Sequence, residues 1–193
     1  MDKLSKIRSA AVYCGASFGN EPAFAAAAER LGKFLAEHHI RLVDGGASIG
    51  LMQILANSVL KNGGDVTGII PAHLAGEICH NKLTKLIMVE TLAERKKRMI
   101  ELADVIIAMP GGFGTWDEFF DAATQRRMKL HHKPCGVLNI SGYFDHLLQF
   151  VEHAISCGMV RPRYRQLIKV GKTPEELFEQ LAGSLTPAVL ASR

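Results

Sequence analysis

A glycine-rich stretch, Pro110 to Glu118, separates an apolar segment from a helical one. The residues before it, Val105 to Met109, are a continuous apolar run that predicts a buried strand. A helix is predicted after Thr115, ending at about Met128. A glycine turn between a buried strand and a helix is typical of an α/β protein, where it presents backbone N–H groups to an anion. The stretch therefore indicates both the fold class and a phosphate-binding turn.

The same alternation of strand and helix recurs along the chain. Strands are predicted at about 10–14, 41–43, 66–70, 85–89, 105–109, 136–139 and 167–170. Helices are predicted at about 22–38, 51–61 and 144–157, after Thr91 and after Thr173 where capping boxes occur, with a loop or short helix at 72–82. Short apolar strands separated by helices predict a mostly parallel sheet with helices on both faces. Right-handed crossovers then give a doubly wound α/β fold of about six or seven strands.

Length and composition narrow the possible classes. The 193 residues suit one domain, and we expect residues 1–8 and 184–193 to be loose termini. The net charge of +4 fits a small anionic ligand and is too weak to predict binding of nucleic acid. No segment predicts a signal peptide or a membrane span, and four scattered cysteines indicate reduced thiols in a cytoplasmic protein. The eight histidines show no ligand spacing, so we expect no metal ion and no cofactor.

Glycine turns follow the first, second and fifth predicted strands, at Gly15, at Gly45–Gly46 and at Gly111 to Gly114. In a parallel sheet all three lie at the carboxyl edge, where ligands bind. We predict that the glycines of the third turn adopt φ > 0 and let a phosphate approach the backbone. A tight turn without a ligand is the alternative, which the convergence of three such turns disfavours.

Glu118 and Arg95 are the candidate chemical groups. Because Thr115-x-x-Glu118 matches a capping box, Glu118 could cap its own helix. A carboxylate beside a bound phosphate costs electrostatic energy that a cap does not require, which favours a chemical role. Arg95 lies in the first turn of a helix, where the helix dipole disfavours a cation, and an arginine there can bind a phosphate bidentately. The alternative for the run Arg95 to Arg98 is a solvated helix face; we expect these two arginines on one side and the intervening lysines elsewhere.

The surrounding residues resemble the LONELY GUY family of cytokinin riboside 5′-monophosphate phosphoribohydrolases, which older descriptions call lysine decarboxylases. The resemblance rests on Pro110-Gly111-Gly112-x-Gly114-Thr115-x-x-Glu118 with Glu94-Arg95-Lys96 upstream, and it extends over about Arg8 to Ala182. It implies a Rossmann-like fold and usually a homodimer with the active site near the interface. It also implies hydrolysis of the N-glycosidic bond of a nucleoside 5′-monophosphate, giving free base and ribose 5-phosphate.

By position, the resemblance assigns Arg95 and Glu118 as the catalytic pair. It assigns substrate binding to Glu77, Lys96, Gly111, Gly112, Phe113, Gly114, Thr115, Trp116, Asp117 and Thr124. Three segments depart from the family pattern. Asp44 and Ala47 replace the tyrosine and last glycine of a Tyr-Gly-Gly-Gly turn, Leu92-Ala93 replaces Met-His, and Gln125 replaces a frequent tryptophan. The departures at Asp44 and Gln125 lie near where the base should sit, and they leave open whether adenine or an N6-modified adenine is the preferred base.

Cleavage of an N-glycosidic bond develops positive charge on the ribose, which a carboxylate such as Glu118 can stabilise while it deprotonates the attacking water. The turn from Gly111 to Thr115 would hold the 5′-phosphate, and Arg95 would orient the substrate and keep Glu118 anionic. A non-catalytic carrier of a phosphorylated ligand, such as molybdopterin cofactor, is the alternative function. We reject a pyridoxal-dependent decarboxylase because no Schiff-base lysine in a distinct cofactor site is recognisable.

Overall fold

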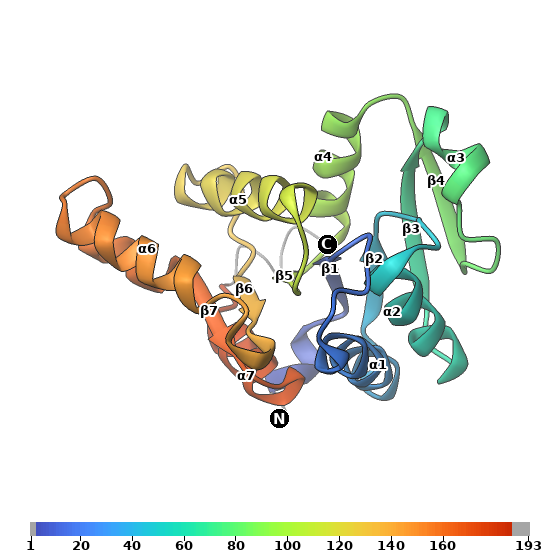
Figure 1. The fold of residues 1–193 in the computed structure, drawn as a ribbon, viewed down its shortest axis with the longest axis horizontal. Coiled ribbons are helices and arrows are strands. Elements are labelled where there is room, and N and C mark those ends of the chain that lie inside the picture. Colours follow the sequence, from blue (N-terminus) through green and yellow to red (C-terminus); the bar gives the residue numbers. More distant parts are fainter. Residues whose placement is uncertain (1–2, 187–193) are drawn as a thin grey trace.

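The computed structural model describes residues 3–186, which form a seven-stranded sheet with helices on both faces (Figure 1). In chain order the elements are η1 (Lys3–Lys6), β1 (Ser9–Tyr13), α1 (Pro22–Glu37), β2 (Arg41–Asp44), α2 (Gly50–Lys61), β3 (Val66–Pro71), α3 (Ala72–Ile78), β4 (Lys85–Val89), α4 (Leu92–Leu102), β5 (Val105–Ala108), α5 (Phe113–Arg127), β6 (Cys135–Leu138), η2 (Ile140–Gly142), α6 (Asp145–Ser156), η3 (Pro162–Leu167), β7 (Ile168–Gly171) and α7 (Pro174–Gly183). The strand order is β4-β3-β2-β1-β5-β6-β7, and all neighbouring strands are parallel. The predicted Rossmann-like, doubly wound α/β fold is confirmed.

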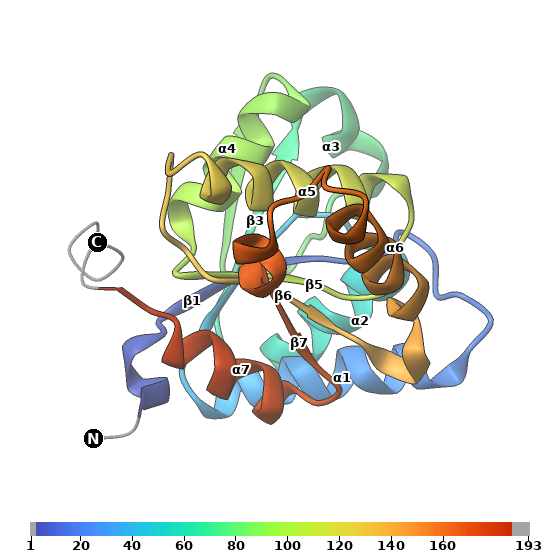
Figure 2. The same ribbon diagram turned by 90° about the vertical axis from the view of Figure 1, so that its left-hand side faces the viewer.

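The helices form two layers. Figures 1 and 2 show α1, α2 and α7 on one face of the sheet and α4 and α5 on the other. Strand β5 illustrates how the sequence fills both layers, because alternate side chains of a strand point to opposite faces. Val105 and Ile107 pack in the core beneath α1, α2 and α7, while Ile106 packs with Met99 and Phe119 under α4 and α5. The continuous apolar run is thus explained by burial on both faces.

The strand order reverses between β1 and β5, and there the two outgoing turns touch. Tyr13 and Ala108 are partners in the register of these strands. The backbone N–H of Gly15 donates to the carbonyl of Pro110 at 3.0 Å, and the N–H of Leu51 donates to the carbonyl of Gly15 at 3.0 Å. In open α/β sheets the crevice at such a switch point is where ligands bind. The fold therefore brings the start of α2 and two of the glycine turns to one place.

Two predicted helix starts are confirmed and one is wrong. Thr91 Oγ1 accepts from the N–H of Glu94 at 3.1 Å, and Thr173 Oγ1 accepts from that of Glu176 at 3.3 Å. In contrast, α5 begins at Phe113, with Gly112 as its N-cap, so Thr115 lies inside the first turn and caps nothing. The alternative that Glu118 belongs to a capping box is thereby excluded.

Residues 3–8 are fixed to the domain rather than loose. Ile7 is buried beside η1, and the backbone N–H of Arg8 donates to Asp104 Oδ2 at 2.7 Å. At the other end Ser184 is the C-cap of α7 and Leu185 packs against the core, while residues 187–193 of the expected tail, like 1 and 2, lie outside the described part. No helix within the described residues is long and apolar enough to cross a membrane.

Candidate active site

A cavity of about 610 Å³ lies at the switch point between β1 and β5. Residues of all three predicted turns line it, among them Gly15, Ala47 and Gly111. The predicted convergence of these turns at one sheet edge is confirmed. The other lining residues are Cys14, Ala16, Ser17, Phe18, Gly19, Phe24, Ile49, Leu51, Met52, Ile78, Arg95, Pro110, Gly112, Phe113, Gly114, Thr115, Trp116, Glu118 and Tyr143.

The turn after β5 needs its glycines for space, not for backbone conformation. None of Gly111, Gly112 and Gly114 has a positive φ, so that prediction is wrong. A Cβ on Gly111 would collide with the side chain of Thr115 and lie 2.8 Å from the backbone nitrogen of Gly15. A Cβ on Gly112 or Gly114 would meet no atom within 4 Å. Gly111 therefore permits close packing of two turns, whereas the other two leave the N-terminus of α5 open to an anion.

An ion pair between Arg95 of α4 and Glu118 of α5 forms part of the cavity wall. Arg95 Nη2 donates to Glu118 Oε1, and the two side chains are only 16% and 11% exposed. Burial raises the pKa of Glu118, although the Arg95 guanidinium favours its anion. A nearly buried carboxylate that still reaches a cavity, with its pKa moved toward neutrality, has the properties of a general base.

Lys96 and Asp117 form a second bridge between α4 and α5. Lys96 Nζ lies 3.0 Å from Asp117 Oδ2 and 3.6 Å from Asp121 Oδ2, and neither Lys96 nor Asp117 lines the cavity. The prediction that Lys96 points away from Arg95 is wrong, because both side chains reach α5. Arg98 pairs instead with Glu101 of its own helix at 2.8 Å. Helix periodicity alone did not predict the contact of Lys96 with α5, because a long lysine side chain can bend toward a carboxylate that lies beside its own face of the helix.

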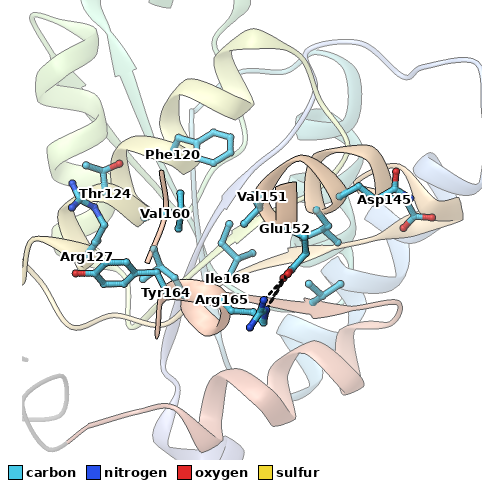
Figure 3. A pocket seen from close by; sticks show the side chains of 15 residues that line it. Phe120, Thr124, Arg127, Asp145, Val151, Glu152, Val160, Tyr164, Arg165 and Ile168 are labelled. Atoms are coloured by element: carbon cyan, nitrogen blue, oxygen red, sulfur yellow. Dashed lines mark hydrogen bonds and ion pairs between the residues drawn. The ribbon is translucent and has the colours of Figure 1, made fainter. Parts of the chain in front are cut away.

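Thr124 lies in a different cavity from the glycine turn. It is exposed near the end of α5 and lines a space of about 680 Å³ between α5, α6, η3 and β7. Figure 3 shows Thr124 with Phe120 and Arg127 on the α5 side of this space. Glu77 lies on α3, whose last residue, Ile78, lines the first cavity. The structure thus gathers Arg95, Glu118 and the residues from Gly111 to Trp116, but not Thr124.

Tyr143 is a cavity residue that the sequence patterns did not single out for a role in the site. It follows η2, and its hydroxyl donates to the carbonyl of Gly111 at 2.5 Å. Its ring meets Phe24 edge to face, with 5.5 Å between centroids. No local signal in the sequence predicts a contact between the segments after β6 and β5.

Much of the remaining wall is aromatic or apolar. Phe113 is 85% exposed, and its ring meets Trp116 edge to face at 5.1 Å between centroids. Phe18, Met52 and Ile78 add further apolar surface. Side chains of this kind stack on or enclose a flat, weakly polar group such as a nucleobase. The cavity therefore combines an anion-binding helix end, a carboxylate and a surface for a planar ring.

Comparison with known proteins places the chain in a family. The family described as "Possible lysine decarboxylase" matches residues 52–181. A cytokinin riboside 5′-monophosphate phosphoribohydrolase of Rhodococcoides fascians is 42% identical over 170 residues, which cover 87% of this chain and 86% of the relative. The chain belongs to the LONELY GUY family. A LONELY GUY relative from Arabidopsis thaliana, of the same descriptive name, is 37% identical over 178 residues, covering 92% of this chain and 82% of the relative.

Solved structures share the fold of this LONELY GUY protein. The molybdenum cofactor binding protein of Rippkaea orientalis superposes with a TM-score of 0.70 at 23% identity, covering 92% of this chain and 97% of its own. The Moco carrier protein of Chlamydomonas reinhardtii gives a TM-score of 0.70 at 20% identity, covering 92% and 96%. At these identities the likeness shows the common fold and carries no argument about the ligand.

Proposed function

We propose that this protein hydrolyses the N-glycosidic bond of a nucleoside 5′-monophosphate, either a cytokinin riboside 5′-monophosphate or AMP, to free base and ribose 5-phosphate. One observation carries the proposal: the Arg95–Glu118 pair stands in the wall of a cavity that also contains the open N-terminus of α5. The names of relatives from Rhodococcoides fascians and Arabidopsis thaliana support it.

The cavity offers a separate place for each part of such a substrate. The 5′-phosphate binds at Gly112 and Gly114, where backbone N–H groups and the helix dipole favour an anion. The base lies against the aromatic wall formed by Phe113 and Trp116. Holding the phosphate, which is remote from the reacting bond, supplies binding energy that orients the ribose toward Glu118.

Glu118 and Arg95 act together on the bond. As the bond between C1′ and the base nitrogen breaks, the bonding electrons leave with the base and positive charge develops on the ribose ring. The Glu118 carboxylate stabilises this charge and takes a proton from the water that adds to C1′, and the departing base takes up one proton, so that one water is divided between ribose and base. Arg95 keeps Glu118 anionic against the cost of burial, which would otherwise favour its protonated form.

The remaining parts of the proposal rest on the family resemblance. Glu77, Lys96, Asp117 and Thr124 are proposed substrate contacts, in addition to the residues from Gly111 to Trp116. We also propose a cytoplasmic homodimer whose active site lies near the subunit interface.

A substrate panel tests the proposal. Ribonucleoside and deoxyribonucleoside 5′-monophosphates, with the matching unphosphorylated nucleosides, are incubated with the protein, and free base and ribose 5-phosphate are quantified. We expect equal amounts of both products from ribonucleoside 5′-monophosphates. Absence of base release from every monophosphate would overturn the proposal, and tight binding of a phosphorylated ligand without turnover would support a carrier instead.

Glu118→Gln tests the assignment of the base. The variant should lose about a hundredfold or more in turnover while it still binds the nucleotide, since general-base roles have this magnitude. Glu101→Gln is the matched control, because it neutralises a carboxylate that is 41% exposed and pairs with residues of its own helix. Turnover above about a tenth of wild type in Glu118→Gln would remove Glu118 from the mechanism.

A further inference from the structure

Three polar side-chain atoms within the described residues are buried without a hydrogen-bond partner: Tyr13 Oη, Asp44 Oδ2 and Arg95 Nε. Tyr13 and Asp44 are the final residues of β1 and β2, so they lie at the same sheet edge as the cavity. Both interact electrostatically with Arg95. Because buried polar groups are nearly always paired, a cluster of exceptions around a candidate catalytic arginine indicates a role in the site.

Asp44 is held in place on one side only. It is 1% exposed, and its Oδ1 accepts from the N–H of Gly46 at 2.9 Å. The Arg95 guanidinium packs on the next residue, because a Cβ on Gly45 would lie 3.4 Å from Arg95 Nη1. The head group of Arg95 therefore lies against the turn that Asp44 begins and also pairs with Glu118 of α5. The Arg95 guanidinium thus interacts electrostatically with two nearly buried carboxyl groups, those of Glu118 and Asp44.

The electrostatic surroundings make the charge of Asp44 variable. Burial raises the pKa of Asp44 to about 7, against the opposing effects of the Gly46 N–H and of Arg95. Cys14 of β1 is a further titratable group near Asp44, and its thiol pKa is raised by burial and then by Asp44 and Glu118. The Asp44 carboxyl therefore changes between its protonated form and its anion near neutral pH.

We propose that Asp44 is a positioning residue that shares Arg95 with Glu118, and that its charge sets how much of the Arg95 charge is available to Glu118 and to an anionic substrate. As a neutral acid, Asp44 leaves the guanidinium to Glu118 and the nucleotide. As an anion, it competes with both. A tyrosine is common at this position in the family pattern, where this chain has Asp44. The inference rests on the nucleotide site of the proposed function.

The test compares wild type with Asp44→Asn between about pH 5.5 and pH 8.5, a range that spans the Asp44 titration. Asparagine has the shape of the neutral acid and cannot ionise. Affinity for AMP is measured by titration calorimetry, and kcat and KM are measured on the substrate found in the panel. At the acid end the two proteins should agree within about twofold, and at the alkaline end wild type should bind AMP at least about threefold more weakly. Ionisation of AMP itself cancels, because both proteins meet the same ligand at each pH.

Asp65→Asn is the matched control, since Asp65 is an exposed aspartate next to β3, and it should follow wild type throughout. Parallel pH profiles for Asp44→Asn and wild type, or an equal offset at every pH, would overturn the inference. If Asp44→Asn does not fold, carboxyl-labelled aspartate in wild type is followed by NMR, and an Asp44 carboxyl that keeps one charge state over this range also overturns it.

The outcomes separate this inference from the proposed reaction. If the AMP affinities of wild type and Asp44→Asn diverge with pH but no base is released, the role of Asp44 is supported and the hydrolase function is overturned. If base is released but the pH profiles of the two proteins are parallel, the hydrolase function is supported and the role of Asp44 is overturned. Failure to bind AMP or any other 5′-monophosphate of the panel at any pH would remove both.

Discussion

The hydroxyl of Tyr143 donates a hydrogen bond of 2.5 Å to the carbonyl of Gly111, and so joins the segment after β6 to the turn after β5. Gly111 also packs on the backbone of Gly15 in the turn after β1. The turn that carries the proposed phosphate site is thus held from two sides. Its position relative to Glu118 depends on these contacts, because a Cβ on Gly112 or Gly114 beside it would meet no atom within 4 Å.

Removal of the Tyr143 hydroxyl should reduce activity more than stability. For Tyr143→Phe we expect kcat/KM to fall about two- to tenfold, the worth of one ordinary hydrogen bond, because the turn loses its fixed position. Steady-state kinetics measure this, with Tyr164→Phe as the control since Tyr164 lines the second cavity. Unchanged kinetics in Tyr143→Phe would show that packing on Gly15 suffices to hold the turn.

The glycines of the turn should respond differently to alanine. Gly111→Ala must displace Thr115 or the backbone of Gly15, so we expect a loss of about 1–3 kcal/mol in the free energy of unfolding, the usual effect of overpacking. Gly112→Ala meets open space, so the fold should survive while nucleotide affinity falls about tenfold or more as the methyl group enters the anion site. Thermal denaturation and calorimetric binding separate the two effects. Equal nucleotide affinity in Gly112→Ala and wild type would show that the phosphate does not bind at Gly112.

Lys96 should matter for substrate rather than for stability. Its partner Asp117 is 65% exposed, and exposed ion pairs contribute at most about 1 kcal/mol. For Lys96→Met we therefore expect a nearly unchanged melting temperature and a KM raised about tenfold, if Lys96 binds the nucleotide as the family resemblance implies. Lys97→Met is the control, because the Lys97 side chain is 76% exposed and pairs within its own helix. An equal KM in Lys96→Met and Lys97→Met would show that Lys96 only bridges α4 and α5 and does not bind the nucleotide.

Much of the fold follows from local signals in the sequence. Apolar runs of strand length such as Val105 to Met109, together with capping boxes at Thr91 and Thr173, place the elements to within a few residues. The parallel order then determines that the glycine turns meet at one edge, as observed. The start of α5 was predicted too late because Thr115 offers a capping pattern that the structure does not use. The helix begins instead at Phe113, after Gly112 as an N-cap with no side-chain hydrogen bond.

The site was predictable in its residues and less so in their pairings. Glu118 and Arg95 stood out by charge and position, but the link between Lys96 and Asp117 depends on the packing of α4 against α5, which helix periodicity does not encode. The role of Gly111 likewise depends on a neighbour distant in sequence, Gly15. Asp44 was noticed only as a departure from the family pattern, because its burial beside Arg95 depends on the packing of α4 against β2.

A partly buried histidine in the segment after α5 should make stability depend on pH. His131 Nε2 lies 2.9 Å from the carbonyl of Ala122, and Nδ1 accepts from the N–H of Lys133 at 3.1 Å. Burial lowers the pKa of His131 to about 4, and Lys133 and Arg126 act in the same direction. Between about pH 6.5 and pH 4 the unfolded chain therefore binds a proton at His131 that the folded chain does not, so this contribution to stability is lost as the pH falls.

His131→Phe isolates this effect, because phenylalanine keeps the ring and cannot titrate. At pH 7 the stability difference between wild type and variant reports the two lost hydrogen bonds together with the change of ring, neither of which depends on titration. As the pH falls toward about 4, the advantage of wild type should shrink by at most about 3 kcal/mol, and by less in practice since the ring is partly exposed. Urea unfolding of both proteins at several pH values measures it. A stability difference that stays constant between about pH 4 and pH 7 would mean that His131 titrates alike in the folded and unfolded chain.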